Sequence, residues 1–183
     1  MKYRGILAMI LALALMLGIL PGMAVASAES KSGICGDNAA WEVDLDSHTL
    51  TIKGTGEMDF NSYYFQAPWS PWEEEIFTII IEEGITYAWG FHTCRWAEEI
   101  RVPTTVTKLD CADFSEMDSL EHIAVAEGNT VYSDIDGVLF TADQKTLLRF
   151  PCGYNGIYTV PATVTKIEES AFSNCSKHST RNF

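Results

Sequence analysis

The chain has 183 residues, 25 of them acidic and 12 basic, which gives a formal net charge of −13. This length allows one domain, or one domain with a small cap. An acidic surface repels phosphate backbones and anionic lipid headgroups, so the composition argues against nucleic acid and a lipid surface as partners.

The first residues have the pattern of a secretory signal peptide. Lys2 and Arg4 precede an apolar run over residues 6–20, and the small residues of "AVASA" follow it. The run is too short to cross a bilayer comfortably, which disfavours the alternative of an uncleaved anchor. We expect cleavage after Ala28, and no membrane span in the remaining chain. The leader holds two of the basic residues and none of the acidic ones, so the mature net charge becomes −15.

The N-terminal part of the remaining chain predicts β-structure. In "WEVDLDSHTLTIKG", apolar and polar residues alternate over 41–45 and again over 50–53, with a short polar connection between them. This pattern is typical of a β-hairpin. The proline- and tryptophan-rich "APWSPW" follows. We therefore predict a β-rich N-terminal capping region over residues 35–78.

The next part of the chain repeats itself. "IRVPTTVTKLDCADFSEM" begins at Ile100, "YTVPATVTKIEESAFSNC" begins at Tyr158, and a degenerate copy begins near Ile81. The unit is about 23 residues long and holds one short strand, a period typical of leucine-rich repeats. We predict an α/β leucine-rich-repeat solenoid over residues 79–183. It would be strand-dominated, with a short parallel sheet of about two to three repeats.

Residues 126–157 interrupt this array. Two apolar runs, Val138–Phe140 and Thr146–Phe150, are joined by the polar "TADQK", which predicts an inserted β-hairpin. The five cysteines, an odd number, contain no C-x-x-C pair and lack the spacing of a zinc site. Buried free thiols are the first expectation, and a single disulfide is the alternative.

These residues carry a resemblance to a family. The segments "VPATVTKI" (160–167) and "AFSNC" (171–175), the inserted hairpin and the N-terminal "CGDNAAWEVDLDSHTLTIKGTGEM" occur in one order. This order resembles the BspA-type leucine-rich-repeat proteins that bacteria export. The resemblance covers about residues 35–175. It implies a secreted or surface-exposed recognition module, associated with adhesion and with binding host or matrix proteins, and no catalytic, cofactor or metal residues.

The chain also departs from the family pattern. Gly90-Phe91 and Asp113-Phe114 replace the usual Ala-Phe, and Met117 stands at the position of Cys175. No closing strand follows Cys175, so we expect either that the last repeat is truncated or that the chain is a fragment of a longer protein.

"DIDGVLF" admits an enzymatic interpretation. Asp134 and Asp136 match the nucleophile loop of a haloacid-dehalogenase-type phosphatase. Such a loop follows a buried apolar strand, whereas "EGNTVYS" precedes this one. Asp and Gly are also the residues of a tight turn, because they tolerate positive φ. We therefore expect a turn and no phosphatase activity. The spacing of acids in a calcium loop is absent as well.

Structural packing also explains the other candidate catalytic and sugar-binding residues. His92 and Cys94 could form a nucleophile pair, but Cys94 aligns with Met117 at an inward repeat position. An aromatic platform could bind sugar rings, although packing of the cap and core explains the same tryptophans: Trp69, Trp72, Trp89 and Trp96.

The remaining candidate surface is the concave sheet, where solenoids commonly bind partners. Its expected contacts are the outward strand positions, namely Thr78, Ile80, Glu99, Arg101, His122, Ala124 and Thr159. The sequence thus predicts a non-catalytic, secreted or cell-surface, adhesin-like protein that recognises an extracellular protein. A carbohydrate-binding module is the alternative.

Overall fold

The computed structural model describes residues 29–60 and 66–175. The predicted signal peptide and residues 176–183 lie outside the described residues. Strands dominate, and the three helices of the described part are short 3-10 helices. No described helix is long and apolar enough to cross a membrane.

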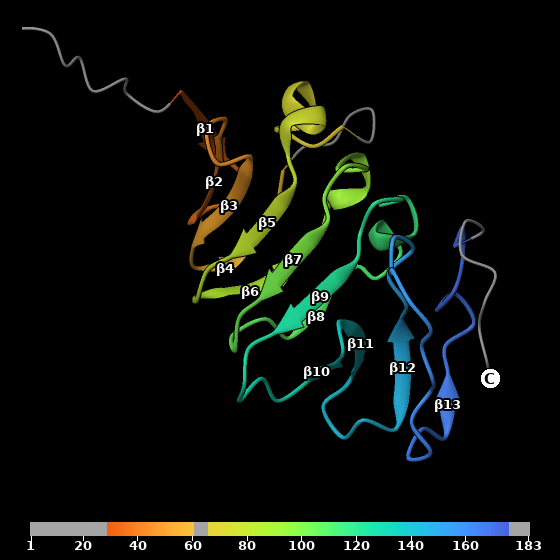
Figure 1. The fold of residues 1–183 in the computed structure, drawn as a ribbon. Helices are drawn as coiled ribbons and strands as arrows, with labels where there is room; N and C mark the ends of the chain where they lie inside the picture. The colour runs from red at the N-terminus through yellow and green to blue at the C-terminus, as the bar shows by residue number, and fades with distance from the viewer. Residues whose placement is uncertain (1–28, 61–65, 176–183) are drawn as a thin grey trace, which may run out of the picture.

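The largest sheet has six strands in the order β1-β2-β3-β5-β7-β9 (Figure 1). Its first three strands are antiparallel, and the β2–β3 pair confirms the predicted hairpin, whereas β3, β5, β7 and β9 are parallel. The strands of the predicted capping region therefore belong to the same sheet as the repeat strands and form no separate layer. The bounds are β1 Ser30–Ile34, β2 Ala39–Asp44, β3 Thr49–Gly54, β5 Thr78–Ile81, β7 Glu99–Val102 and β9 His122–Val125.

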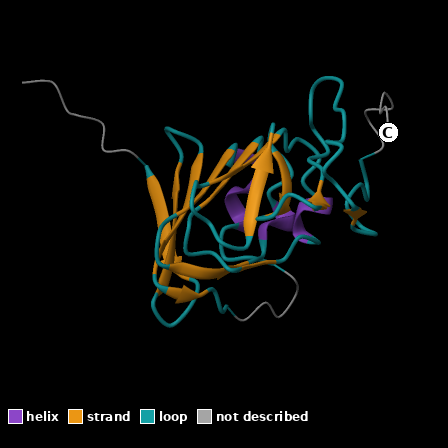
Figure 2. Cartoon of the chain, turned by 90° about the horizontal axis from the view of Figure 1, so that it is seen from below, coloured by secondary structure: helices purple, strands orange, loops and turns teal. Residues whose placement is uncertain are grey.

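A second, smaller sheet runs under the first. It contains β4 (Gly56–Glu57), β6 (Ile85–Ala88) and β8 (Lys108–Leu109), all parallel. Three short helices, η1 (Ser70–Glu75), η2 (Phe91–Thr93) and η3 (Asp113–Ser115), precede β5, β7 and β9 in turn. They lie in a row at one end of these strands (Figure 1), and Figure 2 shows them gathered together.

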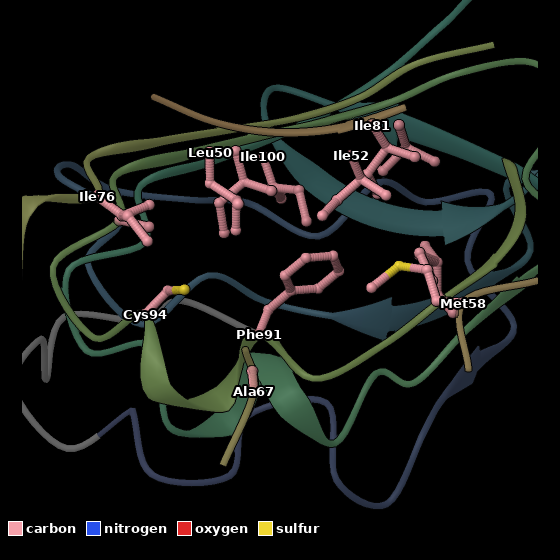
Figure 3. Close-up of a cluster of buried hydrophobic side chains, with 14 of the residues drawn as sticks. Leu50, Ile52, Met58, Ala67, Ile76, Ile81, Phe91, Cys94 and Ile100 are labelled. Carbon is pink, nitrogen blue, oxygen red and sulfur yellow. The ribbon is translucent and has the colours of Figure 1, made fainter. Parts of the chain in front are cut away.

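The core lies between the two sheets and the helices. Leu50, Ile52 and Ile100 point into it from the large sheet, and Phe91 and Cys94 meet them from the helix side (Figure 3). Repeat-equivalent residues stack in register, with a shift of 21 residues from Ile79 to Ile100 and 23 from Ile100 to Ile123. The inward positions of the first two repeats are buried, namely Ile85 and Val106, Phe91 and Phe114, and Cys94 and Met117, whereas Ile167 of the last repeat is 42% exposed.

The insertion forms two consecutive hairpins. Strands β10 (Tyr132–Ile135), β11 (Val138–Thr141) and β12 (Thr146–Arg149) pair antiparallel, and β13 (Lys166–Ile167) adds parallel to β12. The predicted β11–β12 hairpin is confirmed. The prediction of a turn at "DIDG" is also confirmed, since Asp136 and Gly137 join β10 to β11 with φ of 53° and 82°.

This insertion closes one edge of the six-stranded sheet. The N–H groups of Ile123 and Val125 point away from β7. The first donates to the Gly137 carbonyl (2.9 Å) and the second to Asp134 Oδ1 (2.8 Å). Unpaired N–H groups on an edge strand invite pairing with other chains. The first aspartate of "DIDG" therefore satisfies a strand edge.

Asn129 holds the insertion against the preceding repeat. Its Nδ2 donates to the carbonyls of Pro103 (2.8 Å) and Val106 (2.9 Å), while its Oδ1 accepts from the N–H groups of Val131 and Tyr132 (both 2.9 Å). The residue is only 9% exposed. This buried amide thus satisfies four backbone groups at once.

A disulfide and a buried arginine fasten the C-terminal unit. Cys152 and Cys175 are bonded, so the single-bridge alternative holds, whereas Cys35, Cys94 and Cys111 are free thiols. The Arg149 guanidinium donates to the carbonyls of Phe114, Ser170 and Ser173. Burial lowers the pKa of Arg149 to about 10. One side chain therefore ties the end of one repeat to the turn of the next.

We expect Asn129→Ala to destabilise the protein by about 2–4 kcal/mol, because it leaves buried backbone donors and acceptors without partners. Urea unfolding at equilibrium measures the effect. The exposed Asn155→Ala should stay within about 0.5 kcal/mol of wild type. Equal stability of the two variants would contradict this role for Asn129.

Candidate functional site

The solvent face of the six-stranded sheet carries two rows of side chains. Strand register places one row along Asp44, Thr49, Thr78, Glu99 and His122, and the next along Glu42, Thr51, Ile80, Arg101 and Ala124. Alternate residues on each strand point into the core, so these rows face outward. The structure brings together all the predicted contacts except Thr159.

Thr159 lies outside this sheet. It belongs to none of the six strands, because the insertion separates the last repeat from β9. The last repeat instead joins the sheet of β10, β11 and β12 through its strand β13. Its predicted place on the common face is therefore wrong. The same insertion approaches His122, since a Cβ built on Gly137 would lie 2.4 Å from the His122 ring.

The predicted capping region also contributes to this face, because the two rows continue across β2 and β3 through Glu42, Asp44, Thr49 and Thr51. None of these residues was among the predicted contacts. The alternation of residues 41–45 already showed which side chains face outward. What it did not show is that β3 pairs with β5.

Arg101 and Lys53 each pair with a carboxylate of this face. Arg101 donates to both Glu99 oxygens, at 3.0 and 3.1 Å, which lowers the pKa of Glu99. Lys53 bonds to Glu42 and lowers the pKa of that carboxyl in the same way. The centre of the face is left uncharged and largely β-branched, with Thr49, Thr51, Thr78 and Ile80.

A shallow apolar groove adjoins this centre. It has a volume of ≈ 330 Å³ at the carboxyl ends of β5, β7 and β9. Its lining is mostly aliphatic, with two charged side chains at the rim: Ile81, Glu83, Arg101, Val102, Pro103, Ala124, Val125 and Ala126. The groove shares Arg101 and Ala124 with the second row, and the uncharged centre shares Thr51 and Ile80 with the same row. They therefore form one continuous surface, which we call the sheet face.

The helix side holds a different pair of hollows. One of ≈ 740 Å³ runs along Trp89, His92 and Asp113, and one of ≈ 370 Å³ lies beside Trp96. Glu73 and Arg95 line both. Arg95 also forms an ion pair with Asp118. This side is rich in carboxylates.

Three of the four tryptophans pack against other aromatic rings, as the packing alternative predicts. Trp69 is fully buried and packs edge-on against Trp41, and Trp72 packs against the same ring. Trp89 stacks on Phe60 at 4.2 Å. Trp96 is the exception, with 54% of its surface exposed.

Local contacts explain why Gly90 and Asp113 stand where the family pattern has the alanine of Ala-Phe. Gly90 has φ of 88°, and a Cβ there would lie 2.5 Å from the Phe60 ring, so glycine is required. The Asp113 carboxylate accepts the N–H groups of Gly90 and Phe91 and lies 3.5 Å from His92 Nδ1. Burial raises the pKa of Asp113 above its ordinary range.

The surroundings of Cys94 are unfavourable for a nucleophilic thiol. Cys94 is fully buried, and burial raises its pKa to about 12. A thiol with that pKa is not a nucleophile at neutral pH. No cluster of three or more metal-ligating side chains occurs in residues 29–60 and 66–175.

We expect Asp113→Asn to be at least as stable as wild type at neutral pH, because an amide oxygen still accepts both N–H groups without a buried charge. A carboxyl whose pKa is raised on folding contributes less stability as pH rises from about 4 through that raised value. Wild type should therefore lose stability relative to Asp113→Asn over this window, as measured by urea unfolding at a series of pH values. The exposed Glu116→Gln serves as control. A relative gain by wild type would contradict the sign.

Comparison with known proteins gives distant structural likenesses only. No family model matches the sequence, and no curated protein matches it. The chain is similar to a leucine-rich repeat protein from Eubacterium ventriosum, at 17% identity and a TM-score of 0.41, over 80% of this chain and 57% of that one. It is also similar to a leucine rich cell surface protein from Faecalibacterium prausnitzii, at 17% identity and a TM-score of 0.43, over 83% of this chain and 69% of that one. Likeness to the pneumococcal vaccine antigen PcpA is weaker, at 13% identity and a TM-score of 0.30, over 76% of this chain and 61% of that one.

Proposed function

We propose that the chain is a secreted or cell-surface recognition protein, a repeat solenoid of the BspA type, whose sheet face binds an extracellular protein. The repeated "VTxI" and aromatic positions support the family, and the leader-like sequence supports export. The protein is adhesin-like and non-catalytic in this proposal. The observation that carries it is the sheet face itself.

The physical character of the sheet face suits a protein partner. An interface core is depleted in charge and rich in apolar contacts, with polar groups at its rim. Here Arg101 pairs with Glu99 and Lys53 pairs with Glu42, so a partner need not desolvate an unpaired charge at the centre. Ile80 lies at the centre of the face, between Thr51 and Arg101. This position makes Ile80 the expected anchor.

Binding to individually immobilised matrix and serum proteins tests the proposal, with protein exported by a bacterial host from the full coding sequence. We expect saturable binding to at least one of them and at least a tenfold loss of affinity in Ile80→Glu, because a carboxylate would be buried in the contact. Thr107→Glu places the same charge beside the small sheet and should bind as wild type does. Equal loss in both variants, or binding to none of these proteins, would reject the sheet face as the site.

A glycan is the second candidate ligand, and Trp96 is the observation that favours it. Its exposed indole stands beside Arg95, Asp118 and Ser119 in the smaller hollow of the helix side. Aromatic rings with adjacent hydrogen-bonding side chains are a common composition of sugar sites. In this alternative the sheet face has no role.

Calorimetric titration with soluble cell-wall glycan fragments distinguishes the two candidates. If the glycan proposal holds, Trp96→Ala should abolish binding, while Ile157→Ala, which trims another exposed apolar side chain, should leave it intact. Glycan binding that survives Trp96→Ala would remove this candidate.

A further inference from the structure

We propose that β1 is a self-association edge, on which a second copy of this chain adds its own β1 to continue the six-stranded sheet. The inference concerns the opposite end of the sheet from the insertion. It does not depend on which ligand the sheet face binds.

The two edges of the sheet are treated differently by the chain. At β9 the insertion supplies acceptors to the outward N–H groups of Ile123 and Val125. β1 pairs with β2 alone, and no other described strand lies beside it (Figure 1). One edge is therefore closed from within the chain, and the other is open among the described residues.

The hydrogen-bond pattern shows which groups of β1 face outward. Leu45 N–H donates to the Glu29 carbonyl (3.1 Å), and Cys35 N–H donates to the Ala39 carbonyl (2.9 Å). Antiparallel pairing alternates, so residues 29, 31, 33 and 35 bond to β2. The N–H and C=O groups of Ser30, Ser32 and Ile34 point the other way. In residues 29–60 and 66–175 these groups have no backbone partner.

This set of groups is complementary to itself. Two copies of β1 related by a two-fold axis at Ser32 pair Ser30 with Ile34 of the second copy and Ser32 with its own equivalent. Each outward N–H then meets an outward C=O, because these are the hydrogen-bonded positions of an antiparallel ladder. The sheet faces of both copies would lie on the same side of one continuous sheet.

The side chains of β1 fit the same arrangement. Lys31 would lie opposite Gly33 of the second copy, and glycine leaves room there, above the Trp41 ring whose Nε1 is 2.8 Å from an added Cβ. A lysine on an edge strand normally discourages pairing. Glu29 pairs with this one at 2.7 Å, which offsets its charge. Ile34 is 77% exposed and would pack beside Ser30 of the second copy.

The small area and the charge set the expected strength. A five-residue edge buries less than the ~1,200 Å² of a stable complex, so the dimer should be weak. Two copies with a net charge of −13 or more negative repel one another, and salt screens that repulsion. Added salt should therefore favour the dimer.

Sedimentation equilibrium on exported protein tests the proposal. Protein concentrations from about 1 μM to 1 mM suit the weak dissociation constant expected of an interface this small. We expect a monomer–dimer equilibrium that strengthens with salt. Ser32→Pro removes an outward donor and leaves the β2 ladder intact, so it should weaken association at least tenfold with an unchanged melting temperature. Ser32→Thr should associate as wild type does. A monomer at all concentrations would overturn the proposal, as would a dimer unaffected by Ser32→Pro.

Amide hydrogen exchange on the wild type gives a second readout that needs no variant. The amides of Ser30, Ser32 and Ile34 should gain protection as protein concentration rises, whereas those of Lys31 and Gly33 should be protected throughout. Protection of all five at the lowest concentration would mean that the same chain covers the edge. That result would overturn self-association at β1.

Discussion

Each unit of this fold buries its apolar side only against its neighbours, and that constraint governs both ends of the stack. Ile79, Ile100 and Ile123 fill the middle because each lies in register on the next. A unit without a neighbour would expose the same surface to water. At the N-terminal end, β2 and β3 and an aromatic cluster take the neighbour's place. The ring centroids of Trp41 and Trp69 lie 6.4 Å apart there, and those of the stacked Trp69 and Phe91 rings lie 5.8 Å apart.

The insertion covers the opposite end of the stack and contributes side chains to two hydrophobic cores. Leu139 packs into the large core, while Val138 and Phe140, its neighbours on β11, pack into a second cluster around Phe150 and Tyr158. A strand buried on both faces reads as an unbroken apolar run, which is how "VLF" stands in the sequence. The insertion therefore connects two hydrophobic cores. Asn129 and Arg149 hold it in place with buried hydrogen bonds to backbone carbonyls.

Most of the fold was readable because periodicity is a local property of the sequence. Alternation identified β2 and β3, and self-comparison placed Phe91 over Phe114 and Cys94 over Met117. The failures all involve contacts between distant segments. The pairing of β3 with β5, the displacement of Thr159 and the bridge between Cys152 and Cys175 depend on how the insertion and the N-terminal hairpin dock. Asn129 carried no signal beyond a turn, since two of its four partners, the carbonyls of Pro103 and Val106, lie 26 and 23 residues away.

The order of parallel pairings also bears on how the chain reaches this structure. The parallel pairings of the large sheet join residues that are 29, 21 and 23 positions apart, so each closes a short loop at small entropic cost. Low contact order of this kind favours rapid folding. Because chains are made from the N-terminus, the β1–β3 unit can form first and present the edge on which β5, β7 and β9 add in turn. The growing edge is then exposed only for the time needed to make about twenty more residues, and the insertion ends that exposure when it arrives.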